Sequence, residues 1–399
     1  MEWKLKDLTV DGKGSYGIGA PAVPYQEDKL TYLRITDIND DGSLNFSDLK
    51  SVDAEDAEKY ILKENDIVFA RTGNSTGRSY FYEKQHGTFV YAGFLIKFSL
   101  DPNKVNPRIL KYYTHSKPYF DWVNSFDTGA TRGNINAKTY GDMEIELPSR
   151  KVQDKIVSIL SSLDRKIELN NKINADLEEM AQAIFKNWFV DFEPFKDGKF
   201  VDSELGMIPE GWKVGTLGDI TKNKSAKVKE RNDVKVLSPV TTGELVLSEE
   251  YFTKQVFSSS IAKYKIVNKG DFAYNPARVN IGSLGRNEFD FDGCVSPVYV
   301  VFSVLDGYEN YFDLFRKTDF FKDSVASLAI GGVRQSLSYD DLSSIEVIIP
   351  SENAVEEFNN LYNQMKKTIK ANKLESSRLS LLRDTLLPRL MSGELEVPE

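Results

Sequence analysis

A ladder of residues spaced alternately by four and three positions runs through the middle of the chain, and it recurs 202 positions later, as from Ile156 to Phe358. This is the spacing of a long helix that buries one seam against a partner helix. The two copies therefore predict that the chain repeats one plan, a globular part followed by a long helix. The first copy is Ile156, Leu160, Leu163, Ile167, Asn170, Asn174, Leu177, Ala181, Ile184, Trp188, and the second is Phe358, Tyr362, Met365, Ile369, Asn372, Ser376, Leu379, Arg383, Leu386, Leu390.

The globular parts repeat as well. Ser149 and Ser351, which we expect to be the N-caps of the two long helices, lie 202 positions apart. A set of ordered matches with a nearly constant offset indicates an internal duplication, because a single match would arise by chance. The other matches are residues 3–8 with 212–219, 66–71 with 271–275, 129–132 with 331–334, and 144–148 with 346–350.

Short apolar runs separated by turn residues predict strands at 30–35, 66–71, 88–98 and 143–147, and a helix at 106–123. The fold class expected is α+β, with two tandem-duplicated globular domains separated by two long helices. The first helix should end near Phe189, since Pro194 and the polar residues after it cannot extend it. The boundaries we expect are a domain at 1–148, a helix at 149–190, a linker at 191–211, a domain at 212–350, a helix at 351–391 and a tail at 392–399.

Two long helices with matching seams most simply bury those seams against each other. If the duplication creates a pseudo-twofold axis, the helices form an antiparallel coiled coil in which paired residue numbers sum to 546. This register places Asn174 opposite Asn372 and Asn170 opposite Ser376, so that polar seam residues meet polar ones and fix the alignment. Leu163 would then face Arg383, which is a mismatch.

The alternative is that each helix packs only on its own globular half. Against this stands the length of the helices, because roughly 37 residues make a rod of about 55 Å. A globular domain of about 150 residues, with a diameter of roughly 30 Å, cannot cover such a rod.

Composition says more about the cellular compartment of the protein than about its function. No run of 18 apolar residues is present, and the first residues lack the apolar segment of a signal peptide. The single cysteine, Cys294, excludes an intrachain disulfide framework and fits the cytoplasm, and we expect it to be a small buried residue. The net charge of −9 argues only weakly against nucleic acid as a partner, since positive charge can be concentrated on one face or supplied by a bound subunit.

The residues that catalysis needs are scarce. The only histidines are His86 and His115, and with one cysteine no zinc pattern can be completed, so we expect no metal site. The glycine-rich stretch 12–17 has the letters of a dinucleotide fingerprint, but no strand leads into it and no helix follows it. We therefore expect no catalytic residues and a chain that is not an enzyme by itself.

Two similar heads at a fixed separation suit a ligand with two sites at a fixed separation, and duplex DNA is the common example. Arginine suits guanine edges and asparagine suits adenine edges, so polar loops beside the shared strands are the candidates for base contacts. A strip of lysines in the second half would instead contact phosphates. The alternative is that these lysines only lie on a solvated loop. The candidate DNA-binding residues are Arg71, Thr72, Asn74, Arg78, Arg132, Asn134, Asn275, Arg278, Asn280, Arg334 and Gln335 on the loops, and Lys224, Lys227 and Lys229 on the strip.

The duplication separates these candidates by role. If the two halves read different sequences, residues common to both cannot specify the target and must be scaffold or phosphate contacts. Arg132 and Arg334 occupy matched positions and belong to that group. The residues that differ between the halves, such as Asn74, Arg78, Asn280 and Gln335, are free to specify.

The whole arrangement resembles the specificity subunits of type I restriction–modification systems. The stretches that carry the resemblance are Asn-Trp-Phe-Val-Asp-Phe-Glu-Pro at 187–194, Leu-Gly-Met-Ile-Pro-Glu-Gly-Trp at 205–212 and Leu-Leu-Pro-Arg-Leu-Met-Ser-Gly-Glu-Leu at 386–395. The resemblance implies that each globular part is a target recognition domain, which reads one half of a bipartite, asymmetric DNA sequence, and that the coiled coil sets the spacer. It also implies two partner modification subunits, which hold S-adenosylmethionine and methylate adenine, and restriction subunits that join them to cleave. No cofactor is expected in this chain.

Two other functions stay open at this point. One is a coiled-coil adaptor that presents two similar heads to protein partners rather than to DNA. Binding to specific DNA that survives added salt and nonspecific competitor would separate the two readings. The other is an autonomous methyltransferase, which would need a cofactor site that the sequence does not offer.

Overall fold

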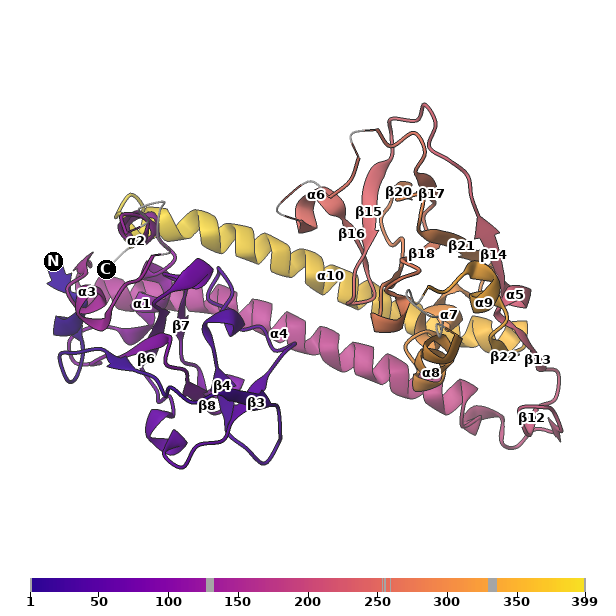
Figure 1. Ribbon diagram of the computed structural model, residues 1–399, viewed down its shortest axis with the longest axis horizontal. Helices are drawn as coiled ribbons and strands as arrows, with labels where there is room; N and C mark the ends of the chain where they lie inside the picture. The colour runs from indigo at the N-terminus through magenta and orange to yellow at the C-terminus, as the bar shows by residue number, and fades with distance from the viewer. Residues whose placement is uncertain are drawn as a thin grey trace. The chain divides into compact units, whose positions relative to one another are not determined.

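The computed structural model describes residues 2–126, 133–252, 254, 256–258, 260–328 and 336–397. It divides into two compact units, of which unit 1 comprises Met1–Asn171 with Lys373–Glu399, and unit 2 comprises Lys172–Asn372. The two longest helices, α4 (Arg150–Phe189) and α10 (Glu352–Met391), each contribute one segment to each unit (Figure 1).

Unit 1 contains two four-stranded sheets, with the orders β2-β9-β6-β7 and β3-β5-β4-β8, and a strand pair β1-β10. All pairings are antiparallel except that of β4 with β8. The strands are β1 (Glu2–Lys4), β2 (Ser15–Tyr16), β3 (Ala22–Pro24), β4 (Thr31–Leu33), β5 (Lys50–Val52), β6 (Asp66–Ala70), β7 (Ser79–Phe81), β8 (Phe89–Tyr91), β9 (Leu95–Ser99) and β10 (Glu144–Glu146), and the helices are α1 (Pro107–Tyr113), α2 (Lys117–Asn124) and α3 (Ala137–Gly141).

Unit 2 has the orders β14-β21-β18-β19 and β16-β15-β20-β17, and a strand pair β13-β22. Its plan matches that of unit 1 except at the edges of the second sheet, where unit 1 has β3 beside β5 and unit 2 has β17 beside β20. Its one parallel pairing, β15 with β20, corresponds to that of β4 with β8. The elements are β13 (Lys213–Thr216), α5 (Leu217–Ile220), β14 (Thr221–Lys224), β15 (Lys235–Pro239), β16 (Leu245–Leu247), α6 (Ser248–Tyr251), β17 (Lys265–Val267), β18 (Phe272–Tyr274), β19 (Leu284–Arg286), β20 (Gly293–Val295), β21 (Val300–Val304), α7 (Glu309–Phe315), α8 (Asp319–Leu328), α9 (Tyr339–Ser343) and β22 (Glu346–Ile349).

Three expected elements differ from the structure. The helix expected at 106–123 is two helices, because α1 ends before Ser116, which is the N-cap residue of α2, and Pro118 stands in the first turn of α2. The strand expected at 88–98 is β8 and β9, joined by a tight turn in which Leu95 N–H donates to the carbonyl of Ala92 at 2.8 Å. The linker at 191–211 contains a small hairpin, β11 (Phe200–Val201) with β12 (Ile208–Pro209), and Ile208 is buried in the core of unit 2.

Each globular core takes up residues from both long helices. In unit 1, Ile156 and Leu160 of α4 share one core with Leu387 and Leu390 of α10. In unit 2, Phe189 of α4 packs against the ring of Phe358 with 5.0 Å between the ring centroids. The alternative in which each helix packs only on its own half is therefore wrong. All twenty ladder residues are buried or half-buried.

Polar side chains meet where the two helices run past each other. In unit 2, Asn372 Nδ2 donates to Asn174 Oδ1 at 2.9 Å. In unit 1, Asn170 Nδ2 donates to Glu375 Oε2 at 2.8 Å and lies 3.4 Å from Ser376 Oγ. Within each unit the contacts fall in an antiparallel order. Asn174 with Asn372 and Asn170 with Ser376 are the pairs that the 546 register specifies, and Glu375 is an additional partner of Asn170.

Arg383 also finds a partner on the other helix. Its guanidinium donates to Asp164 Oδ1 at 3.0 Å, next to Leu163, which the register places opposite Arg383. The mismatch between a leucine and an arginine is thus resolved by an ion pair one residue away. Among the described residues, no helix is long and apolar enough to cross a lipid bilayer.

Candidate nucleic-acid interface

Two hairpin loops, β6–β7 in unit 1 and β18–β19 in unit 2, have the same length and are closed by an equivalent backbone hydrogen bond. Ala70 N–H donates to the carbonyl of Arg78 at 2.8 Å, and Asn275 N–H donates to that of Ser283 at 3.1 Å, so each bond encloses seven residues. The last of the seven is a glycine with positive φ in both loops, Gly77 at 89° and Gly282 at 96°. The two loops therefore present side chains at matched positions.

In each unit, the segment just before α3 or α9 closes the loop from the side. The N–H of Ile135 donates to the carbonyl of Arg71 at 2.9 Å, and that of Leu337 donates to Pro276 at 3.1 Å. In unit 1 this contact also joins Thr72 to Asn134 as an isolated β-bridge. Two of the predicted site residues are therefore brought together, and Asn134 is exposed beside the loop.

At matched positions the side chains differ in size, charge and hydrogen-bonding capacity. Arg71 corresponds to Pro276, and Arg78 corresponds to Ser283, by the backbone bonds above. Between these, the equal loop lengths match Gly73 with Arg278, Asn74 with Val279, and Ser75 with Asn280. A common backbone that carries different chemistry is what two recognition loops with different targets require.

In unit 1, the arginines of the loop are held by the protein itself. Arg78 Nε donates to Asp40 Oδ1 at 2.7 Å and its Nη1 donates to the carbonyl of Ile38 at 3.0 Å. Arg71 lies between two aromatic rings, 5.3 Å from the centroid of Tyr16 and 5.7 Å from that of Phe94. Asn74 is exposed, and its side chain makes no hydrogen bond within the described part of the chain.

Arg71 is the less satisfied of the two arginines. Its buried Nε has no hydrogen-bond partner among the described residues, and no carboxylate there forms an ion pair with it. The charge is therefore balanced by ring faces rather than by an acid, which leaves it available to an anion.

In unit 2, the loop offers its polar groups more openly. Arg278 and Asn280 are both exposed. Asn275 is half-buried, and its Oδ1 accepts a hydrogen bond from the N–H of Ala277 at 3.1 Å, which fixes the direction of the amide.

The lysine strip divides into one structural residue and two exposed ones. The ammonium of Lys224 lies 2.7 Å from Asp271 Oδ1, and Asp271 is buried. Lys224 is therefore the counter-ion of a buried carboxylate, unlike the phosphate contact that we expected. Lys227 and Lys229 are exposed on the next loop, as a phosphate contact requires.

Three predicted residues, Arg132, Arg334 and Gln335, lie outside the described residues. The sequence reasoning also missed some. Phe94 and Val298 occupy matched turns, after β8 and after β20, and are 54% and 72% exposed. Tyr16, beside Arg71, is 44% exposed. An apolar residue next to a strand is normally assigned to the core, so only the duplication could have singled out Phe94 and Val298.

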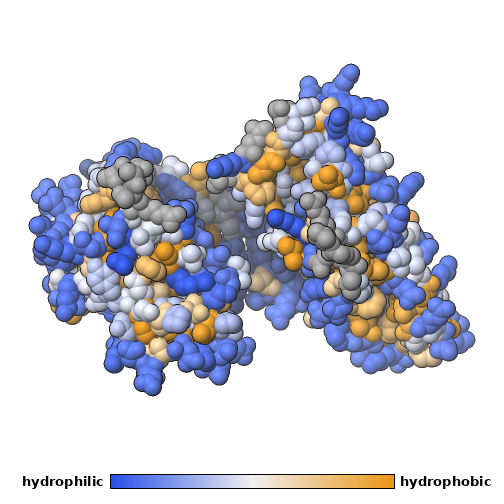
Figure 2. Space-filling model, viewed as in Figure 1, coloured by the Kyte–Doolittle hydropathy of each residue, from blue (hydrophilic) through white to orange (hydrophobic). Residues whose placement is uncertain are grey.

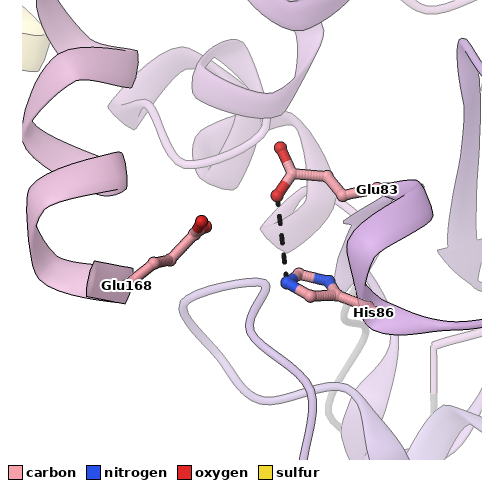
Figure 3. A group of neighbouring side chains, drawn as sticks. All are labelled: Glu83, His86 and Glu168. Carbon is pink, nitrogen blue, oxygen red and sulfur yellow. Dashed lines mark ion pairs between the residues drawn. The ribbon is translucent and has the colours of Figure 1, made fainter. Parts of the chain in front are cut away.

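Polar side chains cover most of the molecular face drawn in Figure 2, with apolar ones between them. In unit 1, Glu83, His86 and Glu168 of α4 come together, with potential ligand atoms within 4.8 Å of one another (Figure 3). Glu83 accepts a hydrogen bond from Arg108 at 2.6 Å and lies 3.5 Å from Lys111. Cations thus already balance this buried carboxylate, and Lys111 extends the ion pairs to Asp164 of α4 at 3.2 Å.

The same network continues along α4. Asp164 accepts hydrogen bonds from Tyr112 at 2.9 Å and from Arg383 at 3.0 Å, and it lies 3.2 Å from Lys111. Burial alone would raise the pKa of this carboxyl, but Lys111 and Arg383 together hold it below its usual value.

Cys294 is fully buried, as the sequence predicts. Burial raises the pKa of its thiol to about 11. The thiolate is the reactive form of cysteine, so this residue is unsuited to act as a nucleophile at neutral pH.

Comparison with known proteins shows what the chain is similar to. The model of the type I restriction modification DNA specificity domain matches residues 16–179. The chain is 29% identical to the type I restriction enzyme MjaIX specificity subunit of Methanocaldococcus jannaschii, over 73% of this chain and 69% of that protein. It is 25% identical to the type I restriction enzyme HindI specificity subunit of Haemophilus influenzae, over 84% of this chain and 88% of that protein. The crystal structure of the S subunit of a type I restriction–modification system from M. genitalium superimposes with a TM-score of 0.57 at 17% identity, covering 98% of this chain and 96% of that one, which shows a shared fold.

Proposed function

We propose that this chain, whose residues 16–179 belong to the family of type I restriction modification DNA specificity domains, recognises a bipartite asymmetric DNA target with its two globular parts. Each part reads one half-site through its hairpin loop, β6–β7 or β18–β19. The chain itself would be the DNA-recognition subunit, and catalysis would belong to its partners.

The observation that supports this proposal most directly is the pair of matched loops. Seven residues are enclosed by equivalent backbone bonds in both units, yet the exposed polar side chains differ, with Asn74 in one loop and Arg278 and Asn280 in the other. Asparagine favours adenine and arginine favours guanine in the major groove. Equal loops with unequal side chains would read two different half-sites, which makes the whole target asymmetric.

The long helices supply the second part of the proposal. We infer that α4 and α10 act as an antiparallel coiled coil that sets the unread spacer between the half-sites. Asn174 and Asn372 support this role, because a buried amide pair fixes the register of two helices and therefore their length of overlap.

Partner subunits would catalyse the methylation and the cleavage of DNA. Two modification subunits would bind this chain, hold S-adenosylmethionine and methylate adenine within the target, and restriction subunits would join them to cleave unmodified DNA. The net charge of −9 agrees with such sharing, since the modification subunits would then supply part of the positive charge that clamps the duplex.

The test is to co-express this chain with a candidate modification subunit in a host without DNA methylation and to map modified adenines across the genome. The expected result is one motif with two short, different half-sites around a fixed gap. A stable complex that methylates nothing would overturn the proposal and favour an adaptor that binds only proteins.

A further inference from the structure

Unit 2 contains a cavity of about 360 Å³ directly beside the β18–β19 loop. Asn275 and Arg278 of that loop contribute to its wall, together with residues of β15 and of the segment after α6. Its volume lies in the range of sites that bind small organic ligands.

The cavity exists where unit 2 has small side chains and unit 1 has large ones. Ser238 and Ser283 line it. By the strand pairing of β4 with β8 and of β15 with β20, Ser238 corresponds to Arg34, and Ser283 corresponds to Arg78 as described above. Two arginine side chains of unit 1 are thus replaced by two hydroxymethyl groups, which leaves room next to a loop of the same length.

Aromatic rings form much of the cavity wall. They come from three segments of unit 2, and Tyr251 among them is 53% exposed. Rings of this kind stack on the flat face of a nucleobase and stabilise its binding whatever the base. The aromatic residues that line the cavity are Tyr251, Phe252, Phe257, Tyr264 and Tyr299.

The polar groups of the cavity suit the edge of a base. Asn275 Oδ1 is fixed by the N–H of Ala277, whereas its Nδ2 donates no hydrogen bond within the described residues. The exposed Arg278 forms no ion pair there either. An amide with a free donor and an unpaired guanidinium are the groups that recognise ring nitrogens, exocyclic oxygens and a nearby phosphate.

We propose that this cavity binds one nucleobase turned out of the DNA duplex at the half-site read by unit 2. The inference rests on the proposed function and deepens it. Turning out a base costs least where the local sequence stacks weakly, so the cavity would add selectivity for a deformable step to the contacts of the loop.

The experiment uses the full chain and the target that the methylation map supplies. Each purine of the unit 2 half-site is replaced in turn by 2-aminopurine and each cytosine by pyrrolocytosine, whose fluorescence rises when they unstack, and thymines are probed with permanganate. One position should respond by several fold on binding. The half-site read by unit 1 serves as the internal reference and should not respond.

A variant that fills the cavity tests its role. Ser296→Phe places a ring in the cavity from a half-buried position, and Ser327→Phe adds the same ring to an exposed serine of α8 outside the cavity wall. Ser296→Phe should abolish the response, and Ser327→Phe should leave it unchanged. Tyr251→Ala, at an exposed position, gives a second variant that keeps the test valid if Ser296→Phe misfolds.

A third part of the experiment distinguishes binding of a base in DNA from binding of a free nucleoside. Mononucleosides are added to the full chain without DNA, and the melting temperature is measured. A rise that Ser296→Phe removes, without any fluorescent response in DNA, would show that the cavity binds free nucleobases and overturn the assignment to DNA. If no position in the half-site responds, or if the response survives in Ser296→Phe, the proposal is wrong, while the methylation motif would still stand.

Discussion

Asn174 of α4 accepts a hydrogen bond from Asn372 of α10, with 2.9 Å between the two side-chain atoms. Asn174 is buried and Asn372 is half-buried, so water cannot readily replace either amide as a hydrogen-bond partner if the other is removed. The pair lies among apolar seam residues, where it contributes alignment more than stability.

Replacing one asparagine should therefore cost more than replacing both. Asn174→Leu alone leaves the amide of Asn372 without a partner, which costs about 1–3 kcal/mol in the free energy of unfolding. The double variant Asn174→Leu with Asn372→Leu should recover or exceed the wild-type stability. Thermal and urea unfolding of the four proteins in the cycle measure this, with Asn171→Leu, an exposed asparagine on α4, as control. A double variant less stable than either single one would contradict the pairing.

The ion pair of Asp164 with Arg383 should make stability depend on pH. The pKa of Asp164 is lowered in the folded state, so its contribution is present above the unfolded value of about 3.9 and is lost as the pH falls through the folded value. Asp164→Asn should then lower the free energy of unfolding by about 1–3 kcal/mol at pH 7, and the difference from wild type should shrink below pH 4.

Urea unfolding at several pH values checks this prediction. Asp384→Asn is the matched control, because Asp384 also contacts Arg383 at 3.0 Å but is 61% exposed and should matter little. Equal losses in the two variants would indicate that Arg383 does not depend on the buried partner.

The long helices and their pairing could be read from the sequence because both depend on local spacing. The seam recurs every three or four residues, and the duplication supplied an independent copy, so Asn174 could be set against Asn372. The globular parts were harder, because strand pairing joins distant residues. Trp3 and Trp212 look equivalent in sequence, yet Trp3 lies opposite Ile145, and the matched position opposite Val347 is Gly215.

Contacts between residues distant in sequence also limited the prediction of the candidate site. Lys224 belonged to a lysine-rich strip, and only the folding of β14 and β18 onto the two sides of β21 brings it to Asp271. Arg78 looked free on its loop, but the segment that contains Asp40 returns to hold it. The duplication still identified the loops themselves, since the shared strands before them locate the matched hairpins.

Substitutions in the two loops should change different halves of the target. Asn74→Ala should reduce discrimination at one base pair of one half-site by about 1–3 kcal/mol, and Arg278→Ala should do so in the other half-site. Binding to duplexes with single base-pair changes measures both effects. Asn171→Ala and Arg378→Ala, exposed residues on α4 and α10, are the controls. If either loop variant weakened binding equally to all sequences, its residue would contact phosphate instead.

The exposed lysines should affect the affinity for DNA rather than the preference for a DNA sequence. Lys227→Gln and Lys229→Gln should each reduce the slope of log K against log salt concentration by about 0.9 without changing base preference. Lys224→Gln should leave that slope unchanged and lower the melting temperature, because it removes the counter-ion of the buried Asp271. A salt slope that fell with Lys224→Gln alone would reverse these assignments.

Lengthening both long helices should lengthen the spacer of the target. A heptad inserted after Lys172 in α4 lies opposite one inserted after Lys373 in α10 under the pairing of Asn174 with Asn372. Seven residues keep the seam in phase and add about 10 Å, which equals about three base pairs. Methylation mapping should return the same two half-sites with a longer gap. A heptad inserted in α4 alone is the control and should abolish methylation, because the two helices would then differ in length by seven residues. A changed half-site in the double insertion would mean that the helices also take part in reading the bases.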